Sequence, residues 1–192
     1  MNHGNILWLR HAEVSENRIY NHVSDKALVT KAGLEAAREQ LRSIEIDRPR
    51  LIFSSPLQRA VQTADLVSNV FSGPLPQTNA VFSEWRPPRL MVDVPPIEEP
   101  WFYDAWRSHR LAYPNSTFDH SESVAAFARR AQLALSLASS AAVDGGTIVV
   151  VSHKVLIGAV AAIHGGARGA SEIFESAKCT SLSNLDWLWL SS

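Results

Sequence analysis

The sequence has only one cysteine, Cys179, and no long run of apolar residues. A single cysteine excludes an intramolecular disulfide, which favours a reducing compartment. The first five residues lack a basic segment, and the apolar run that follows them stops at Arg10, so the start does not resemble a signal peptide. No stretch approaches the ~20 apolar residues of a membrane-spanning helix. We therefore expect a cytoplasmic protein that has no contact with a membrane.

The sequence also lacks an excess of charge of either sign, because the formal net charge of the 192 residues is −1. Without a global positive field, the composition does not support a nucleic-acid partner. The apolar share of 46% and the charged share of 19% are typical of one folded domain of this length. The basic residues are 14 arginines and 4 lysines, and arginine binds phosphate or carboxylate oxygens through a planar fork. Any binding of an anion must therefore depend on a few arginines grouped at one site and not on the overall charge.

Short apolar runs alternate with segments of helical spacing. Strands are predicted at 6–9, 51–53, 147–151 and 182–190. Helices are predicted after the cap Thr30, from Pro56 after the cap Ser55, from the cap Ser121 to Ala142, and at 154–164. This alternation predicts a single α/β domain over residues 1–192, a three-layer sandwich with a mostly parallel sheet between two layers of helices.

Residues 82–120 interrupt this pattern, because six prolines are interleaved there with aromatic residues. Prolines at this density suit neither a long helix nor a central strand. We expect an irregular insertion with one helix near 100–111 that lies over the active site and contacts the substrate. Its candidates for binding a second anionic group are Arg86, Arg89, Arg107, Arg110 and His109.

Three of the predicted strands end in reactive side chains. The first strand continues into Arg10-His11, and the Val-rich strand at 147–151 continues into Ser152-His153. The strand at 51–53 ends at Ser54-Ser55-Pro56, with Arg59 one turn further on. Ligands of such folds bind at the carboxyl ends of the strands. Two histidines at the ends of separate buried strands are therefore candidate catalytic residues.

Metal-dependent and serine-dependent hydrolysis fit the sequence less well. His11-Ala12-Glu13 has the His-x-Glu spacing of zinc deaminases, but their Pro-Cys-x-x-Cys partner is impossible with one cysteine. No His-Glu-x-x-His segment occurs. Ser152 lacks the Gly-x-Ser-x-Gly elbow of serine hydrolases. We expect neither a metal nor a cofactor.

The same segments resemble signature blocks of the histidine phosphatase superfamily, the phosphoglycerate mutase-like proteins of branch 1 type. Leu9-Arg10-His11-Ala12-Glu13, with Asn17 four residues on, is similar to the opening block. Residues 54–64, Ser-Ser-Pro-Leu-Gln-Arg-Ala-Val-Gln-Thr-Ala, are similar to the block whose arginine binds phosphate. Val151-Ser152-His153 is similar to the block of the second histidine. Weaker similarities lie at 30–33 and 121–130, and the strong matches follow the order of the family.

The resemblance implies a phosphomonoesterase that acts on a small phosphorylated metabolite through a covalent phosphohistidine. His11 would attack the phosphorus. Arg10, Arg59 and a protonated His153 would hold the phosphate oxygens, and Asn17 would add a hydrogen bond. A neutral His11 beside a charged His153 requires that the pKa values of the two imidazoles differ.

The resemblance also implies a proton donor for the leaving oxygen. Glu84, at the start of the insertion, is similar in position to the catalytic acid of the family. Its rivals for this role are Glu13, Asp93, Glu98 and Glu99.

Four residues depart from the family pattern: Ala12, Val14, Ser121 and Lys154. Ala12 replaces a glycine and requires a turn of negative φ. Two other functions share this fold, namely a phosphoglycerate mutase-type phosphotransferase and a non-catalytic phospholigand-binding module. The mutases of the family that depend on a cofactor are usually longer, and all four core Arg and His residues are present here. We therefore favour hydrolysis.

Overall fold

The computed structural model describes residues 5–14, 22–92 and 102–191. Within these residues, the strands are β1 (Asn5–Arg10), β2 (Leu51–Ser54), β3 (Gln77–Thr78), β4 (Thr147–Ser152) and β5 (Trp187–Ser191). The helices are α1 (Lys31–Arg42), α2 (Gln58–Val70), α3 (Tyr103–Ala112), α4 (Val124–Ala142), α5 (Lys154–His164) and α6 (Ala170–Cys179). Two short 3-10 helices, η2 (Ala80–Phe82) and η3 (Arg89–Met91), precede α3. None of the described helices is both long and apolar enough to cross a bilayer.

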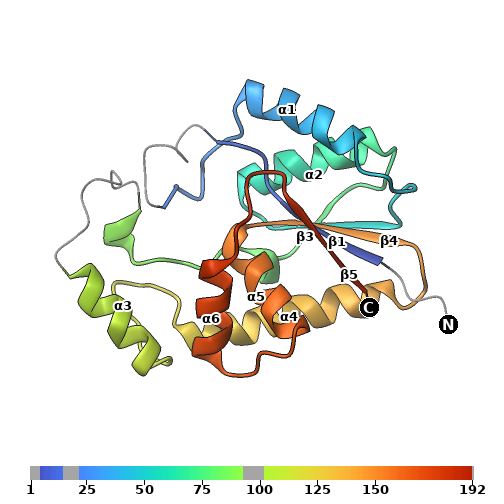
Figure 1. Ribbon diagram of the computed structural model, residues 1–192. Helices are drawn as coiled ribbons and strands as arrows, with labels where there is room; N and C mark the ends of the chain where they lie inside the picture. The colour runs from blue at the N-terminus through green and yellow to red at the C-terminus, as the bar shows by residue number, and fades with distance from the viewer. Residues whose placement is uncertain (1–4, 15–21, 93–101, 192) are drawn as a thin grey trace.

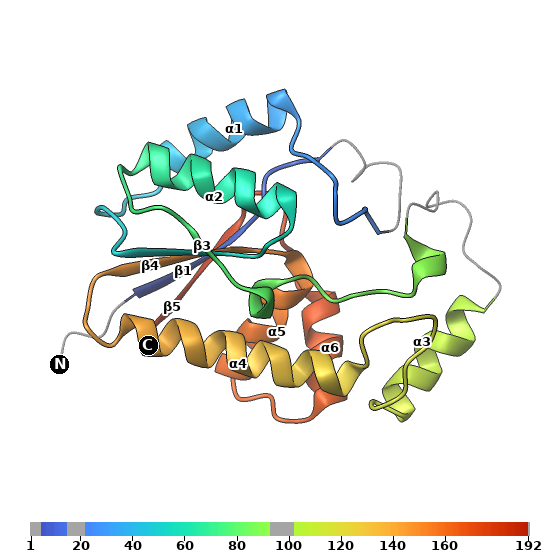
Figure 2. The ribbon, with the colours of Figure 1, turned by 180° about the vertical axis from the view of Figure 1, so that it is seen from behind.

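The strands form one sheet in the order β3-β2-β4-β1-β5. All neighbours are parallel except β5, which runs antiparallel to β1. Helices α1 and α2 cover one face of the sheet, and α4, α5 and α6 cover the other (Figures 1 and 2). The predicted three-layer α/β/α sandwich with a mostly parallel sheet is thereby confirmed.

The side chains of β1 alternate between two apolar cores. Ile6 and Trp8 belong to the core that includes residues of α4, α5 and α6. Leu7 and Leu9 belong to the core that includes residues of α1 and α2. Because successive residues of a strand point to opposite faces, a strand with helices on both sides must be apolar throughout. This explains why continuous apolar runs in the sequence predicted β1, β2 and β4.

The start of α2 differs from the prediction. The helix begins at Gln58 and not at Pro56, and its N-cap residue, Leu57, provides no side-chain hydrogen bond. Ser55 lies two residues before the N-cap position and so cannot cap the helix, although its Oγ accepts a hydrogen bond from the Leu57 N–H at 3.2 Å. The Ser55 hydroxyl is therefore available for another contact, described below.

The start of α4 also lies later than predicted. Ser123, and not Ser121, caps the helix, since its Oγ accepts a hydrogen bond from the Ala126 N–H. The Ser121 hydroxyl accepts instead from the Phe118 N–H at 3.1 Å. The prediction that Thr30 caps α1 is confirmed by its bond from the Gly33 N–H at 2.9 Å.

Two elements were not predicted, and one was predicted too long. Strand β3 has only two residues, too few for a period to be visible. Helix α6 has its buried residues Ile173, Phe174 and Ala177 at helical spacing, a period that the sequence itself contains. Strand β5 begins at Trp187 and not at 182. The residues from 180 to 186 form a loop that reaches the ends of the other strands.

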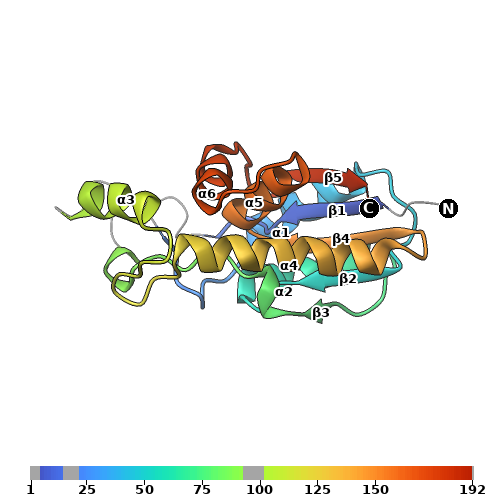
Figure 3. The same ribbon diagram turned by 90° about the horizontal axis from the view of Figure 1, so that it is seen from below.

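Aromatic side chains pack the described part of the insertion against α6. Trp85 stacks on Trp106 of α3 with ring centroids 5.7 Å apart, and it meets Phe174 of α6 edge-on at 5.0 Å. Helix α3 itself lies beyond the end of the sheet, as Figure 3 shows. One helix was expected near 100–111, and α3 confirms it.

Candidate active site

The register of the sheet brings the reactive strand ends together. β1 and β4 are paired to their last residues, and the His11 N–H then donates to the Ser152 carbonyl at 3.0 Å. On the other side of β4, the Ser55 N–H donates to the Val151 carbonyl at 3.0 Å. The backbone therefore places His11, His153 and Ser55 side by side at the carboxyl edge of the sheet, where ligands bind in folds of this type.

His11 is 4% exposed, and two partners orient its ring. Its Nδ1 lies 2.7 Å from the carbonyl oxygen of Ala12, and the Nε–H of Arg59 points to its Nε2 at 3.2 Å. A carbonyl can only accept and a guanidinium can only donate, so Nδ1 carries the proton and Nε2 presents its lone pair. Burial, followed by the charges of Arg59 and Arg10, lowers the pKa of His11 to about 3. The ring is therefore neutral at pH 7.

Arg59 is the second residue of α2 and is buried. Its Nη1 donates to the carbonyl of Ser24 at 3.0 Å. Its own carbonyl accepts from the Thr63 hydroxyl at 2.7 Å, and the same Thr63 Oγ1 accepts from the Ala12 N–H at 3.0 Å. The first turn of α2 and the turn after β1 are thereby held together, which fixes the guanidinium beside the imidazole of His11.

His153 is the N-cap residue of α5 and is 1% exposed. Its ring centroid lies 5.1 Å from that of His11, and its Nε2 lies 2.8 Å from the Ser55 Oγ. Its Nδ1 is buried and has no hydrogen-bond partner among the described residues. Burial, followed by the charges of His11 and Arg59, lowers the pKa of His153 well below 6.5. We call His11, Arg59 and His153 the strand-end pocket.

The surroundings of the two histidines shift the pKa values of both rings in the same direction. A protonated His153 beside a neutral His11 was expected, with pKa values that differ. Burial and the neighbouring arginines lower both pKa values, because the two rings share the same surroundings. The strand-end pocket by itself therefore favours two neutral imidazoles.

Arg10, the last residue of β1, lies near the pocket and is partly buried. Its Nη1 donates to the carbonyl of Leu182 at 2.5 Å, and its Nε has no partner among the described residues. Burial lowers the pKa of Arg10, and the charges of Glu84 and Asp186 oppose this effect. Glu84 and Arg10 therefore lie within electrostatic range of each other.

The carboxylate of Glu84 lies at the start of α5. Its Oε2 accepts from the Val155 N–H at 3.1 Å, and its Oε1 accepts from the Trp85 N–H at 2.8 Å. Since His153 caps the same helix, Glu84 and His153 meet at the same helix end. This position is suitable for a group that exchanges a proton with an atom bound in the strand-end pocket.

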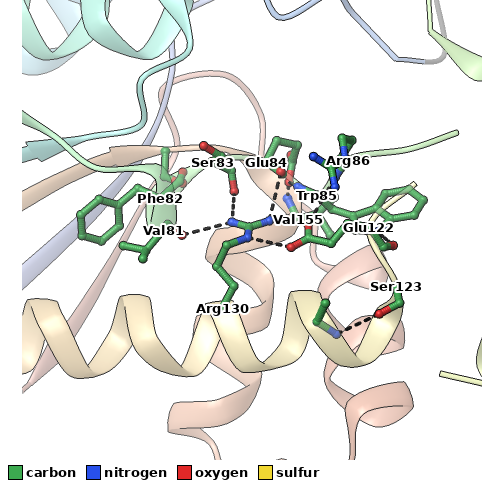
Figure 4. Close-up of polar contacts among 12 residues, drawn as sticks. Val81, Phe82, Ser83, Glu84, Trp85, Arg86, Glu122, Ser123, Arg130 and Val155 are labelled. Carbon is green, nitrogen blue, oxygen red and sulfur yellow. Dashed lines mark hydrogen bonds and ion pairs between the residues drawn. The ribbon is translucent and has the colours of Figure 1, made fainter. Parts of the chain in front are cut away.

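Arg130 of α4 binds the backbone that carries Glu84 (Figure 4). Its Nε and Nη2 form a two-pronged ion pair with Glu122, at 2.8 and 2.6 Å. Its Nη1 and Nη2 donate to the carbonyls of Val81, Ser83 and Glu84 at 3.1, 2.6 and 3.2 Å. One side chain thus binds three carbonyls within four residues and fixes the course of this loop.

We call residues 81–86 the Glu84 loop. Among the rival acids, Asp93, Glu98 and Glu99 lie outside the described residues, and so does Asn17, a predicted phosphate ligand. The carbonyl of Glu13 accepts from the Thr30 N–H at 3.1 Å. The same carbonyl would lie 2.6 Å from a Cβ on Gly33, so only glycine fits there.

Several residues of the site were not predicted as functional. Ser55 was predicted only as a helix cap, and Thr63 was not predicted to have a role, although both lie in the block 54–64. Asn184, in the loop before β5, donates to the carbonyls of His11 and Ala12 at 3.0 and 3.1 Å. No motif marked Asn184, because its role depends on a loop distant in sequence.

The departure at Ala12 is explained by its backbone. Ala12 is not among the described residues with positive φ. The turn therefore has the negative φ that allows alanine in place of the glycine of the family pattern. Val14 is fully buried and forms an isolated bridge with Val29. In the described residues, no group of three or more His, Cys, Asp or Glu side chains is arranged to hold a metal ion.

Comparison with known proteins agrees with this geometry. The sequence matches the histidine phosphatase superfamily (branch 1) over residues 6–187. No curated protein sequence matches the chain. Among solved structures, the fold is similar to that of mycobacterial hydrolase 1, with a TM-score of 0.76, 19% identity, and coverage of 99% of this chain and 92% of the other.

Two further structures are phosphatases by name. A putative alpha-ribazole-5'-P phosphatase from Escherichia coli has a TM-score of 0.74 and 19% identity, with coverage of 99% of this chain and 91% of the other. A mycobacterial glucosyl-3-phosphoglycerate phosphatase has a TM-score of 0.73 and 20% identity, with the same coverage. At these identities, the likeness establishes the fold.

Proposed function

Because the chain belongs to branch 1 of the histidine phosphatase superfamily, we propose that it is a phosphomonoesterase that acts through a phosphohistidine on His11. One observation carries this proposal. The Nε2 lone pair of His11 faces the Arg59 guanidinium, while Nδ1–H is bound to the Ala12 carbonyl. A fixed, neutral imidazole beside a cation is what nucleophilic attack on an anionic phosphate requires.

In the first step, the Arg59 Nε–H turns from His11 to a phosphoryl oxygen, and the Nε2 lone pair that this frees attacks the phosphorus in line with the leaving oxygen. The N–P bond forms as the P–O bond breaks, and the Ala12 carbonyl stabilises the positive charge that the ring gains. Arg59 and Arg10 bind the phosphoryl oxygens. Glu84 gives a proton to the leaving oxygen. We keep Asn17 as a further ligand of the phosphate.

In the second step, water attacks the phosphorus of the phosphohistidine. The carboxylate of Glu84 takes a proton from this water as the N–P bond breaks, and inorganic phosphate is released. The negative charge of a bound phosphate opposes the effect of Arg59 on the pKa of His153 and raises it. We therefore propose that His153 gains its proton only when substrate binds, and then holds a phosphate oxygen.

The substrate class that we propose is a small phosphorylated metabolite. The names of two similar structures, an alpha-ribazole-5'-P phosphatase and a glucosyl-3-phosphoglycerate phosphatase, support this class. Segment 82–120, which includes all of the Glu84 loop except Val81, is proposed to contact the part of the substrate beyond the phosphate. We propose that neither a metal nor a cofactor takes part.

The test is hydrolysis of p-nitrophenyl phosphate by the purified protein. Activity should persist in excess EDTA and should be inhibited by vanadate, which mimics the five-coordinate transition state. Loss of activity on chelation, with recovery on addition of metal, would falsify the mechanism. Incubation with 3-phosphoglycerate, with and without 2,3-bisphosphoglycerate, separates hydrolysis from mutase activity. Phosphate binding without any turnover indicates a binding module.

A further inference from the structure

Arg110, near the end of α3, is a buried cation within an aromatic cluster. It is 4% exposed, and its guanidinium carbon lies 4.2 Å from the Trp106 ring centroid. The corresponding distances are 4.8 Å to Phe174 and 5.1 Å to Trp85. Aromatic rings attract the positive charge. They do not supply the hydrogen-bond acceptors that a guanidinium requires.

Two nitrogens of the Arg110 guanidinium group lack acceptors within the described part of the chain. Its Nε and Nη1 are buried, and neither has a hydrogen-bond partner among the residues that the structure describes. No ion pair joins Arg110 to any described carboxylate. A buried charge without a counterion is costly, and so is each buried donor without an acceptor. The aromatic cluster alone therefore does not account for this arginine.

A cavity of about 80 Å³ opens beside Arg110, between α3 and α6. Its lining includes the cations Arg107, Arg110 and Lys178, together with Glu175. Glu175 is exposed and forms no ion pair with a described residue. The space exceeds several-fold the ~10–15 Å³ that one water molecule needs. The cavity is therefore positively charged and large enough for a small anionic group.

Two residues of the cavity lining, Arg110 and Lys178, lie beside the Glu84 loop. The Nζ of Lys178 lies 5.8 Å from the ring centroid of Trp85, the residue after Glu84. Burial lowers the pKa of Lys178, with a further contribution from Arg110, while the charge of Glu84 opposes this. Glu84 has the same effect on Arg10 at the strand-end pocket. Glu84 is thus within electrostatic range of cations at both sites.

We propose that Arg110 and Lys178 form a subsite for a second anionic group on the substrate, a carboxylate or another phosphate. The substrate class then narrows to phosphomonoesters that carry such a group within reach of the strand-end pocket. This proposal rests on the proposed phosphatase function. Of the five insertion residues that the sequence predicted for this role, Arg107 and Arg110 line the cavity, and Arg110 is the buried one. Arg86, by contrast, is exposed, and its Nε donates to the His120 carbonyl.

The test measures affinity by isothermal titration calorimetry in a His11→Ala background, so that ligand turnover does not interfere. One pair of ligands is 3-phosphoglycerate and its methyl ester, and the other is glucose 1,6-bisphosphate and glucose 6-phosphate. In at least one pair, the ligand with the second anion should bind about 10- to 100-fold more tightly, as expected for charged hydrogen bonds. The affinity for inorganic phosphate, measured in the same way, tests the strand-end pocket without the second anionic group.

Adding Arg110→Gln or Lys178→Gln should remove most of this preference. Lys178→Gln is the more secure variant, because Lys178 is only partly buried and its loss threatens the fold least. Arg89→Gln is the control, since Arg89 is an exposed insertion residue outside the cavity lining, and it should keep the preference. Equal affinities within both pairs, with inorganic phosphate still bound, contradict the subsite alone. If neither inorganic phosphate nor any of the four phosphate esters binds, the proposed function is contradicted as well.

Discussion

The strand-end pocket and the Glu84 loop lie next to each other but are held in place differently. The two histidines of the pocket directly follow β1 and β4, and Arg59 lies in the first turn of α2, shortly after β2. The register of these three strands is fixed by backbone hydrogen bonds. The loop is held by side chains, namely Arg130 at three carbonyls and the Ser152 hydroxyl, which donates to the Phe82 carbonyl at 2.8 Å. The sheet thus positions the groups for the phosphate, and side-chain contacts position the proposed acid.

This difference leads to distinct expectations for mutants. A change in the strand-end pocket should affect every phosphomonoester to a similar extent, because all of them share the phosphate. A change in the Glu84 loop should depend on the leaving group, because only a basic leaving oxygen needs a proton. Comparison of an alkyl phosphate with p-nitrophenyl phosphate in each variant distinguishes the two regions.

The largest effect is expected for His11→Ala. The variant lacks the atom that bonds to phosphorus, so turnover should fall by roughly 10⁴-fold or more on both substrates, as for other lost nucleophiles. No acid-labile, base-stable phosphoenzyme should appear in a quenched reaction. His153→Ala is the matched control, because it retains His11 and should still label slowly. A labelled His11→Ala protein would show that the nucleophile lies elsewhere.

The next effect is expected for Glu84→Gln. The amide keeps the size of the side chain but cannot donate the proton, so hydrolysis of alkyl phosphates should fall by ~10²–10⁴-fold. The loss should be smaller with p-nitrophenyl phosphate, whose leaving group is a weak base. Equal losses on both substrates would leave only a structural or binding role for Glu84. If neither substrate is hydrolysed more slowly, the proton donor is Glu13 or another acidic residue of the insertion.

Arg59→Lys tests whether the fork, and not just the charge, serves the pocket. Lysine cannot donate to His11 and to phosphate in the planar geometry of arginine. The value of kcat/KM should fall by roughly 10²-fold or more, equally for both substrates, by analogy with the loss of one preorganised donor. Arg38→Lys, an exposed change on α1, is the control. Full activity of Arg59→Lys would remove Arg59 from the mechanism.

The smallest effect on activity is expected for Arg130→Lys. The ammonium cannot bind Glu122 and three carbonyls together, so the Glu84 loop should loosen. Alkyl phosphate hydrolysis should fall by about 10-fold and p-nitrophenyl phosphate hydrolysis by less, a weaker form of the Glu84→Gln pattern. Denaturant unfolding should show a loss of about 1–3 kcal/mol, because charged hydrogen bonds are broken. Arg129→Lys, an exposed neighbour, should change neither quantity. A leaving-group-independent loss would contradict a positioning role for Arg130.

Much of this organisation was predicted from local patterns. β1, β2 and β4 appear as continuous apolar runs because they are buried on both faces. His11 and His153 could be identified because each directly follows such a run. Helix starts were less accurate, since Ser55 and Ser121 are good caps in isolation but form other contacts in the fold.

The sequence by itself determined which strands form and which reactive groups stand at their ends, because both depend on adjacent residues. Only the tertiary structure decided the state of those groups. The lowered pKa of His153 results from burial and from the charges of residues on other elements. The contacts of Asn184, Arg130 and Arg110 join segments far apart in the chain, and no local pattern encodes such contacts. Hydrophobic periodicity reports which face of an element is buried, whereas the partners of a buried polar group depend on how the elements pack.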